Sequence, residues 1–156
     1  MAEYIYPGDQ AINPGESATF TLATVPCTRG LIRWRPGSGA FNLSGWVPNR
    51  RCGCRCNNAK SANYKVTFGS NVGLPEGTDV APITLAFALD GVILADTTII
   101  SSPATANTFN SIERTFTVPI WRNCCQTVTV TNTGTTPVTL RNAIIDFDRP
   151  DLCVTY

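Results

Sequence analysis

The residues around position 53 form the densest group of reactive side chains in the sequence. Three cysteines stand there at every second position: Cys52, Cys54 and Cys56. Three arginines accompany them: Arg50, Arg51 and Arg55. A second cysteine pair, Cys124-Cys125, follows later, and the chain contains no histidine. These residue types could build a metal site, a redox centre, a disulfide or a basic binding loop.

The cysteine spacing separates these four possibilities. A zinc site needs four nitrogen or sulfur ligands, usually as two C-x₂₋₄-C pairs. Two cysteines spaced as C-x-C chelate one tetrahedral ion poorly. Five thiolates could still converge if the two clusters pack together, because neighbouring arginines favour the thiolate form. A thioredoxin-like centre needs C-x-x-C at the start of a helix, which neither cluster provides. The spacing therefore favours disulfides, with a metal as the alternative, and no cofactor is indicated.

Disulfides between the two clusters are the leading interpretation. If residues 52–56 are extended, their three sulfurs lie on one face, whereas Cys124 and Cys125 in a strand would point to opposite faces and serve two partners. A closed loop of about 70 residues would stabilise the fold by about 4 kcal/mol. The chain has seven cysteines, so at least one thiol is free or pairs between subunits. The isolated Cys27 and Cys153 are expected to be small buried hydrophobic residues.

Catalysis is disfavoured by composition. Without histidine, no Ser-His-Asp or Cys-His arrangement exists. Asp146 and Asp148 are spaced like two outward residues of one strand; they could bind calcium, but a solvated strand face is favoured. The glycines of "RPGSG" match neither a Walker motif nor a dinucleotide-binding motif. The sequence therefore predicts a protein that is not an enzyme.

The basic residues are concentrated in less than half of the chain. The net charge is only +1, but residues 17–75 hold eight basic residues and no acid, whereas the remaining chain is acidic. Arg29, Arg33 and Arg35 share one strand face by their spacing, and with the arginines at 50, 51 and 55 they are the predicted docking residues for an acidic partner. The alternative is that basic and acidic segments face each other within the fold. A pI of about 7.5 is far below that expected of a nucleic-acid-binding domain, so no nucleic acid is predicted.

Apolar and polar residues alternate with a period of two, which is typical of half-buried strands. This alternation predicts strands at 17–22, 30–35, 63–68, 83–89, 114–120, 127–131, 138–147 and 152–156. Asp90-Gly91 is a strong signal for a two-residue hairpin, and a slip in the apolar phase predicts a bulge near Asn142. We therefore predict one all-β domain over residues 1–156, a jelly-roll β-sandwich of about eight to ten antiparallel strands. Residues 1–16 would be an N-terminal arm or the first strand.

The sequence also argues against a membrane location. It contains no run of eighteen apolar residues, so no membrane span is predicted. The start, "MAEYIYPGDQ", lacks the basic and apolar regions of a signal peptide.

The order of elements over residues 60–156 resembles the C1q/TNF-like jelly roll. "YKVTF", "ITLAFALDGVILADTTI", "RTFTVPI", "QTVTVTNTG" and "VTLRNAIIDF" follow one another as in the C1q-like domains of bacterial spore-surface glycoproteins. The resemblance implies a compact homotrimer that binds other surfaces, and it brings no catalytic residues. It further implies that Tyr64, Phe68, Phe116 and Phe147 divide between the sandwich core and a threefold interface.

The whole chain resembles small virion-surface proteins of phages and prophages of gut Firmicutes. The stretches that carry this likeness are "VPCTRGLIRWRPGSGAFNLSGWVPNRRCGC", "YKVTFGSNVGLPEG", "VPIWRNCCQTVTVTN" and "RPDLCVTY". The resemblance implies a capsid decoration or head-fibre protein, made in the bacterial cytoplasm and bound to the major capsid protein or another virion component. The alternative is a trimer that binds a receptor or glycan through exposed aromatic residues such as Trp46 or Trp121. We expect those tryptophans to lie instead in the core or a subunit interface.

Overall fold

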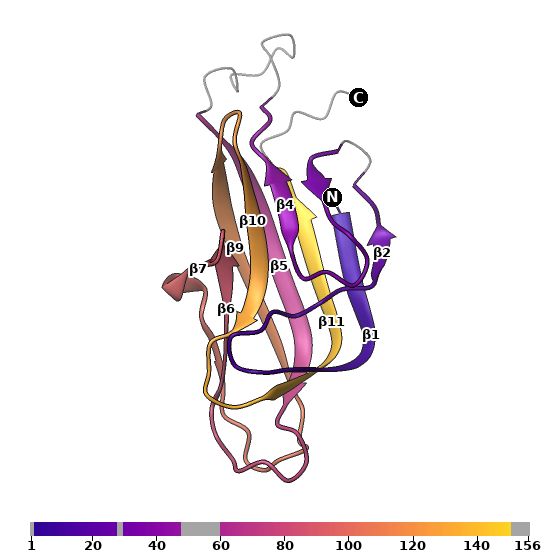
Figure 1. Cartoon of the computed structure of the whole chain (residues 1–156), viewed down its shortest axis with the longest axis vertical. Coiled ribbons are helices and arrows are strands. Elements are labelled where there is room, and N and C mark those ends of the chain that lie inside the picture. Colours follow the sequence, from indigo (N-terminus) through magenta and orange to yellow (C-terminus); the bar gives the residue numbers. More distant parts are fainter. Residues whose placement is uncertain (1, 28–29, 48–59, 151–156) are drawn as a thin grey trace.

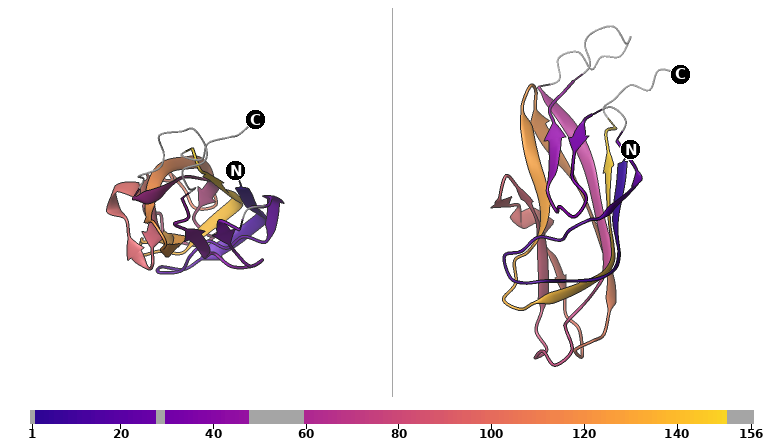
Figure 2. Two further views of the ribbon diagram at one scale, coloured as in Figure 1. Left: turned by 90° about the horizontal axis from the view of Figure 1, so that it is seen from above. Right: turned by 45° about the vertical axis from the view of Figure 1, so that its right-hand side comes forward.

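The computed structural model describes residues 2–27, 30–47 and 60–150. These residues form strands along the length of an elongated sandwich (Figures 1 and 2). The elements are β1 (Ala2–Ile12), β2 (Leu22–Val25), β3 (Ile32–Arg33), β4 (Phe41–Ser44), β5 (Ser61–Gly73), β6 (Ile83–Leu89), β7 (Val92–Ile93), the 3₁₀ helix η2 (Ala95–Thr97), β8 (Ile99–Ser101), β9 (Asn110–Trp121), β10 (Cys125–Asn132) and β11 (Val138–Asp148).

The strands form two antiparallel sheets. Sheet A has the order β2-β1-β11-β5-β9, and sheet B has the order β3-β4-β10-β6-β7, with β8 also paired to β6. From β4 onward the chain crosses repeatedly between the sheets, so that sequence neighbours such as β9, β10 and β11 are not all sheet neighbours. This connectivity is that of a two-sheet jelly roll, which confirms the predicted fold class.

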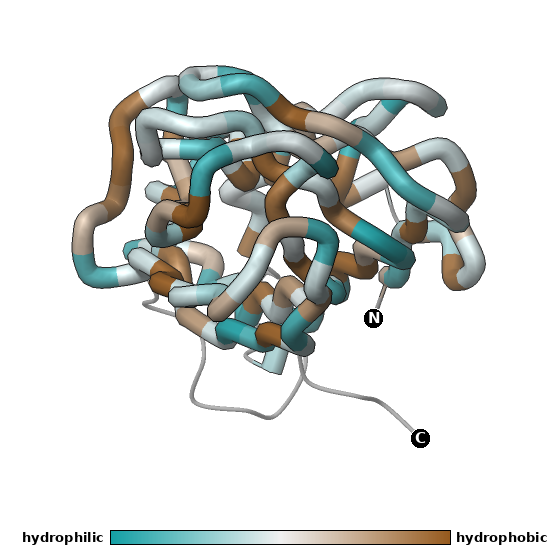
Figure 3. Tube along the Cα trace, turned by 90° about the horizontal axis from the view of Figure 1, so that it is seen from below, coloured by the Kyte–Doolittle hydropathy of each residue, from teal (hydrophilic) through white to brown (hydrophobic). Residues whose placement is uncertain are grey.

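The core lies between the two sheets and is rich in aromatic rings. Along β5 every second residue is buried, from Ala62 to Val72, because successive side chains of a strand point to opposite faces. Figure 3 shows hydrophobic and hydrophilic residues interspersed along the chain. At the centre of the aromatic cluster, the Phe41 ring lies 4.8 Å from that of Tyr4 and 4.9 Å from that of Phe147, measured between centroids.

Two local predictions are confirmed. Asp90 and Gly91 have φ of 51° and 81° and join β6 to β7, as a two-residue turn with positive φ at both positions requires. The pairing of β11 with β5 slips between Arg141 and Ile144, and Asn142 has φ of 52°. The Asn142 Oδ1 atom accepts the backbone N–H of Gly8, which lies in the matching irregularity of β1. The irregularity at Asn142 thus shifts the pairing of β11 with both of its neighbours, β1 and β5.

The predicted strand at residues 17–22 is wrong. Ala18 and Phe20 are buried as expected, but Leu22 is exposed and begins β2. Among residues 17–21, only Ser17 makes a β-bridge, with Thr131 of sheet B. The backbone here passes from one sheet to the other: the Ala18 N–H donates to Val130 and the Thr21 N–H donates to Ile5. A segment whose backbone bonds to both sheets is not a regular strand of either one, although its side chains alternate in burial.

Three of the four large aromatic residues that were expected to divide between the core and a threefold interface lie in the core. Tyr64, Phe68 and Phe147 are all buried in the core of a single chain, and Phe116 is half-buried against that core. Strand β4 was not predicted, and the predicted C-terminal strand at 152–156 lies outside the described residues.

Candidate functional site

A groove opens on the outer side of sheet B, where β4 ends beside the β9–β10 turn, at the upper end of the molecule in Figure 1. Its volume is about 330 Å³. We call it the β4 groove. Its lining residues come from β3, β4 and the β9–β10 turn with their flanking residues: Gly30, Leu31, Arg33, Asn42, Ser44, Trp46, Asn123, Cys124 and Cys125.

The strand register explains why polar side chains gather in the β4 groove. Arg33 lies opposite Asn42, and Asn42 lies opposite Thr127, so three strands contribute one row on the outer face of sheet B. In the part of the chain that the structure describes, the side chains of Arg33, Asn42 and Asn123 make no hydrogen bond or ion pair. No acidic residue is among the lining residues. The groove therefore offers one cation and two amides to a ligand.

Two buried side chains hold the backbone beneath the β4 groove. The Tyr64 hydroxyl donates to the carbonyl oxygen of Ser44 at 2.6 Å and lies 3.2 Å from that of Leu31. The guanidinium of Arg149 donates to the carbonyl oxygen of Trp46 at 3.2 and 3.3 Å. It also stacks over the Tyr64 ring, 4.7 Å from its centroid. These contacts fix residues 44–46, because breaking them would leave buried polar groups unpaired.

The β9–β10 turn is pressed closely against the end of β4. Asn123 has φ of 62°, a left-handed conformation that asparagine tolerates better than most residues. The Gly45 N–H donates to the carbonyl oxygen of Cys124 at 2.7 Å. A Cβ atom on Gly45 would lie 2.0 Å from the carbonyl oxygen of Trp121. Only glycine allows this approach.

The structure brings together part of the predicted thiol and arginine set. Cys124, Cys125 and Arg33 all line the β4 groove, and both thiols are exposed. The expectation that Cys124 and Cys125 point to opposite strand faces is wrong, because Cys124 belongs to the turn and only Cys125 to β10. Both side chains reach the same groove.

The remaining predicted residues fall elsewhere. Arg35 is exposed but does not line the groove, because β3 ends at Arg33. Cys27 is half-buried against the core rather than fully buried. The burial of Tyr4, with a further contribution from the Cys27 charge, raises the pKa of Tyr4 to about 12. The other predicted residues lie outside the described residues: Arg29, Arg50, Arg51, Arg55, Cys52, Cys54, Cys56 and Cys153. Disulfides between the two clusters therefore stay a prediction.

Both tryptophans expected in the core or an interface are exposed in the single chain. Trp46 is 48% exposed at the β4 groove, and Trp121 is 64% exposed on the outer face of sheet A. A core position is therefore excluded for both. Asn42 and Asn123 were not predicted as site residues; Asn42 lies in the run "AFNLS" and Asn123 in the turn sequence "RNCC".

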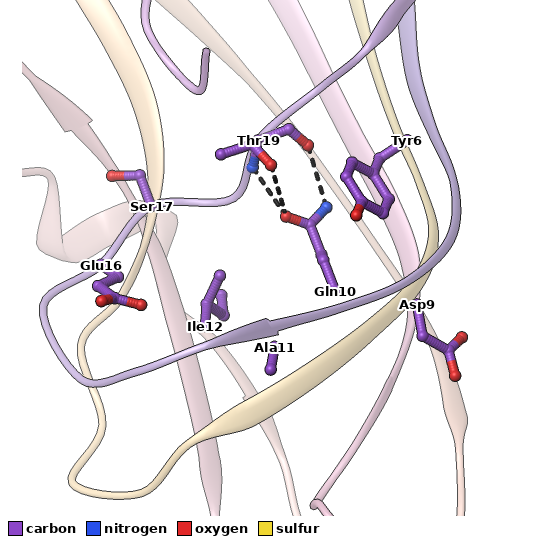
Figure 4. A pocket seen from close by; sticks show the side chains of 8 residues that line it. All are labelled: Tyr6, Asp9, Gln10, Ala11, Ile12, Glu16, Ser17 and Thr19. Carbon is purple, nitrogen blue, oxygen red and sulfur yellow. Dashed lines mark hydrogen bonds between the residues drawn. The ribbon is translucent and has the colours of Figure 1, made fainter. Parts of the chain in front are cut away.

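A second hollow, with a volume of about 540 Å³, lies between β1 and residues 16–19, where the chain passes from one sheet to the other (Figure 4). Its central side chain is Gln10, whose Oε1 accepts the backbone N–H of Thr19 and whose Nε2 donates to the Thr19 carbonyl oxygen. Asp9 is held by Arg141 at 2.7 Å, which lowers the pKa of the Asp9 carboxyl. Because these polar groups already bond within the chain, the β4 groove is the stronger candidate.

Asp146 and Asp148 both point outward from β11, as predicted. Asp146 lies opposite Glu3 of β1. Burial, then the charge of Glu3, a hydrogen bond with it and the charge of Glu113 raise the pKa of Asp146. In residues 2–27, 30–47 and 60–150, no group of three or more acidic, cysteine or histidine side chains is placed to hold a metal ion.

Replacing Asp146 with asparagine will stabilise the protein at neutral pH. Folding raises the pKa of this carboxyl, so its stabilising contribution is complete below the ordinary pKa of 3.8 and is lost as the pH rises through the raised value. Asparagine imitates the protonated acid and removes a like-charge cross-strand pair, for a gain of about 0.5 kcal/mol at pH 7. Urea unfolding at pH 7 and pH 3 measures this gain, which should vanish at pH 3. Asp148→Asn, at an exposed position, is the control; an equal gain there would contradict the prediction.

The described part of the chain defines a jelly-roll β-sandwich with an open groove, and no helix in it is long and apolar enough to cross a membrane. No protein-family model matches the chain, and no curated protein sequence matches it.

Several solved structures resemble the fold. Pika GITRL has a TM-score of 0.41 at 8% identity, covering 96% of this chain and 99% of that one. The CBM22-1 xylan-binding domain of Xyn10C from Paenibacillus barcinonensis has a TM-score of 0.34 at 12% identity, covering 94% and 93%. The GH26-CBM35 β-(1,4)-mannanase of Podospora anserina has a TM-score of 0.34 at 13% identity, covering 93% of this chain and 29% of that one. At this level of similarity, none of them indicates what this chain binds.

Proposed function

We propose that the protein is a non-enzymatic component of a virion surface, a homotrimeric capsid decoration or head-fibre protein. The observation that carries the proposal is the presence of two separate contact surfaces, an apolar sheet edge and the surface around the exposed Arg35, on a chain without histidine. Such surfaces suit assembly and binding rather than catalysis. The virion location follows from the sequence resemblance.

The apolar sheet edge supports assembly between copies. β7 and β8 both pair with β6 and so follow one edge of sheet B. Val92 is 66% exposed and Ile93 is 41% exposed on β7, and Ile100 is 68% exposed on β8. Covering side chains of this size is favourable by roughly 25 cal/mol per Å², and exposed apolar patches mark interaction sites. We assign this edge to the contact between copies.

Light scattering on the purified protein should give about three times the chain mass of 16.8 kDa. Ile100→Asp places a charge in the assigned contact and should yield monomers. The matched control is Val80→Asp, since Val80 is 56% exposed but lies outside the β strands; it should remain trimeric. Wild-type monomers at micromolar concentration would refute the trimer.

Docking to the particle is tested by co-sedimentation with undecorated capsids from the virus that encodes the chain. Arg35 is exposed outside the β4 groove, and we assign it to an acidic capsid surface. Arg35→Glu should then reduce co-sedimentation at least tenfold, and added salt should weaken wild-type binding because exposed charges are screened over about 8 Å at physiological ionic strength. Arg33→Glu, within the groove, is the control. Absence of wild-type co-sedimentation would overturn the virion role.

A second candidate function is recognition of a glycan. The half-exposed Trp46 beside the β4 groove favours it, because an indole ring offers a large contact area with little loss of conformational freedom.

A further inference from the structure

The β4 groove combines the groups that recognise a sugar bearing a carboxylate. Trp46 presents an indole ring that is 48% exposed, an apolar surface on which the C–H groups of a sugar ring can pack. Asn42 and Asn123 add amides that can both donate to and accept from hydroxyl groups. Arg33 adds a guanidinium, whose planar fork matches a carboxylate with two hydrogen bonds.

These groups are free to bind a ligand. Within the described residues, Arg33, Asn42 and Asn123 have no side-chain partner in the chain. The sole ion pair between residues that the structure describes joins Arg141 of β11 to Asp9 of β1, both in sheet A. Since the lining residues include one arginine and no acid, the groove favours an anion over a neutral or cationic ligand.

The frame of the β4 groove is rigid. The Tyr64 hydroxyl and the Arg149 guanidinium bind the backbone of residues 44 and 46 from below. Gly45 joins the groove floor to the β9–β10 turn by a 2.7 Å hydrogen bond to Cys124. A fixed frame lowers the ordering cost of binding.

We propose that the β4 groove binds saccharides that carry a carboxylate, with Arg33 on the carboxylate, Trp46 against the sugar ring, and Asn42 and Asn123 on hydroxyl groups. The proposal deepens the second candidate function and does not depend on the virion role. An open groove admits one or a few residues of a longer sugar chain. The two sources of such a sugar, sialylated glycans and polyuronates, share this chemistry.

Calorimetric titration of the purified full chain tests the proposal, with 3′-sialyllactose, tri-galacturonate and neutral lactose as probes. At least one acidic saccharide should bind at least tenfold more tightly than lactose, and which of the two binds identifies the source. Arg33→Ala should weaken that binding at least tenfold, and Trp46→Ala should do the same. Each variant is first checked by thermal unfolding to confirm that it remains folded.

The chain offers a matched control for each variant. Arg35 is exposed two residues beyond Arg33 but does not line the groove, and Trp121 is exposed on the outer face of sheet A. Arg35→Ala and Trp121→Ala should therefore bind as the wild type does. Three results would each overturn the proposal: no binding of either acidic saccharide at millimolar concentration, equal binding of lactose, or undiminished binding by folded Arg33→Ala. Failure of capsid co-sedimentation would leave these titrations unaffected, so the two proposals fail separately.

Discussion

Gly45→Ala will lower the free energy of unfolding by about 3 kcal/mol, measured by urea denaturation. The new Cβ atom would lie 2.0 Å from the carbonyl oxygen of Trp121 and 2.9 Å from that of Cys124. Both are backbone atoms, so relief requires the whole β9–β10 turn to move away from β4. That movement would break the 2.7 Å hydrogen bond between Gly45 and Cys124.

Gly69→Ala is the matched control for this prediction. A Cβ atom at Gly69 would meet only the Ile144 Cγ2 atom at 3.4 Å and the Ile112 carbonyl oxygen at 3.7 Å, which are ordinary contact distances. Its unfolding free energy should stay within about 0.5 kcal/mol of the wild type. If the two variants unfold at the same urea concentration, β4 and the turn are not pressed together as described.

Phe41→Ala will destabilise the protein by about 4 kcal/mol, in the range found for removal of a buried phenylalanine. Phe41 is fully buried, and its ring packs against the rings of Tyr4, Phe147 and Phe20, the last at 5.4 Å between centroids. Its loss leaves a cavity between the sheets that rigid strands cannot close.

Two variants calibrate the Phe41 result in the same urea experiment. Phe41→Leu retains most of the volume and should cost about 1.5 kcal/mol. Phe109, by contrast, is only partly buried and lies beneath the Arg141 guanidinium at 3.9 Å, so Phe109→Ala should cost less than half as much as Phe41→Ala. An equal cost for Phe41→Ala and Phe109→Ala would contradict the central position of Phe41 in the core.

Features set by short-range chemistry were predictable from the sequence. The Asp90-Gly91 turn needs only residues that tolerate positive φ, and the Asn142 bulge is visible as a slip in the apolar phase. That residues 17–21 form no strand was not predictable, because their backbone bonds to Ile5 in sheet A and to Val130 in sheet B. Alternating hydrophobicity reports which side chains are buried, but not which sheet their backbone joins.

The candidate site was only partly predictable for the same reason. The sequence identified Arg33, Cys124 and Cys125 by residue type. It could not place Asn42 between Arg33 and Thr127, because that row depends on the register of β4 with both β3 and the sequence-distant β10. Trp46 was expected in the core or a subunit interface, because tryptophan usually is largely buried. Its exposure depends on where β4 ends.

The first strand of the chain pairs with the last one that the structure describes. Ala2 lies opposite Phe147 and Ile12 opposite Val138, and the hydrogen bond from Gly8 to Asn142 joins residues 134 positions apart. As the ribosome makes the chain from its N-terminus, sheet A cannot form around β1 until β11 has been synthesised. Closing so large a loop precedes any gain from the pairing, and folds dominated by such distant pairings form in milliseconds to seconds. Sheet A is thus completed only after β11 has been synthesised, and until then the apolar face of β1 stays accessible to other chains or chaperones.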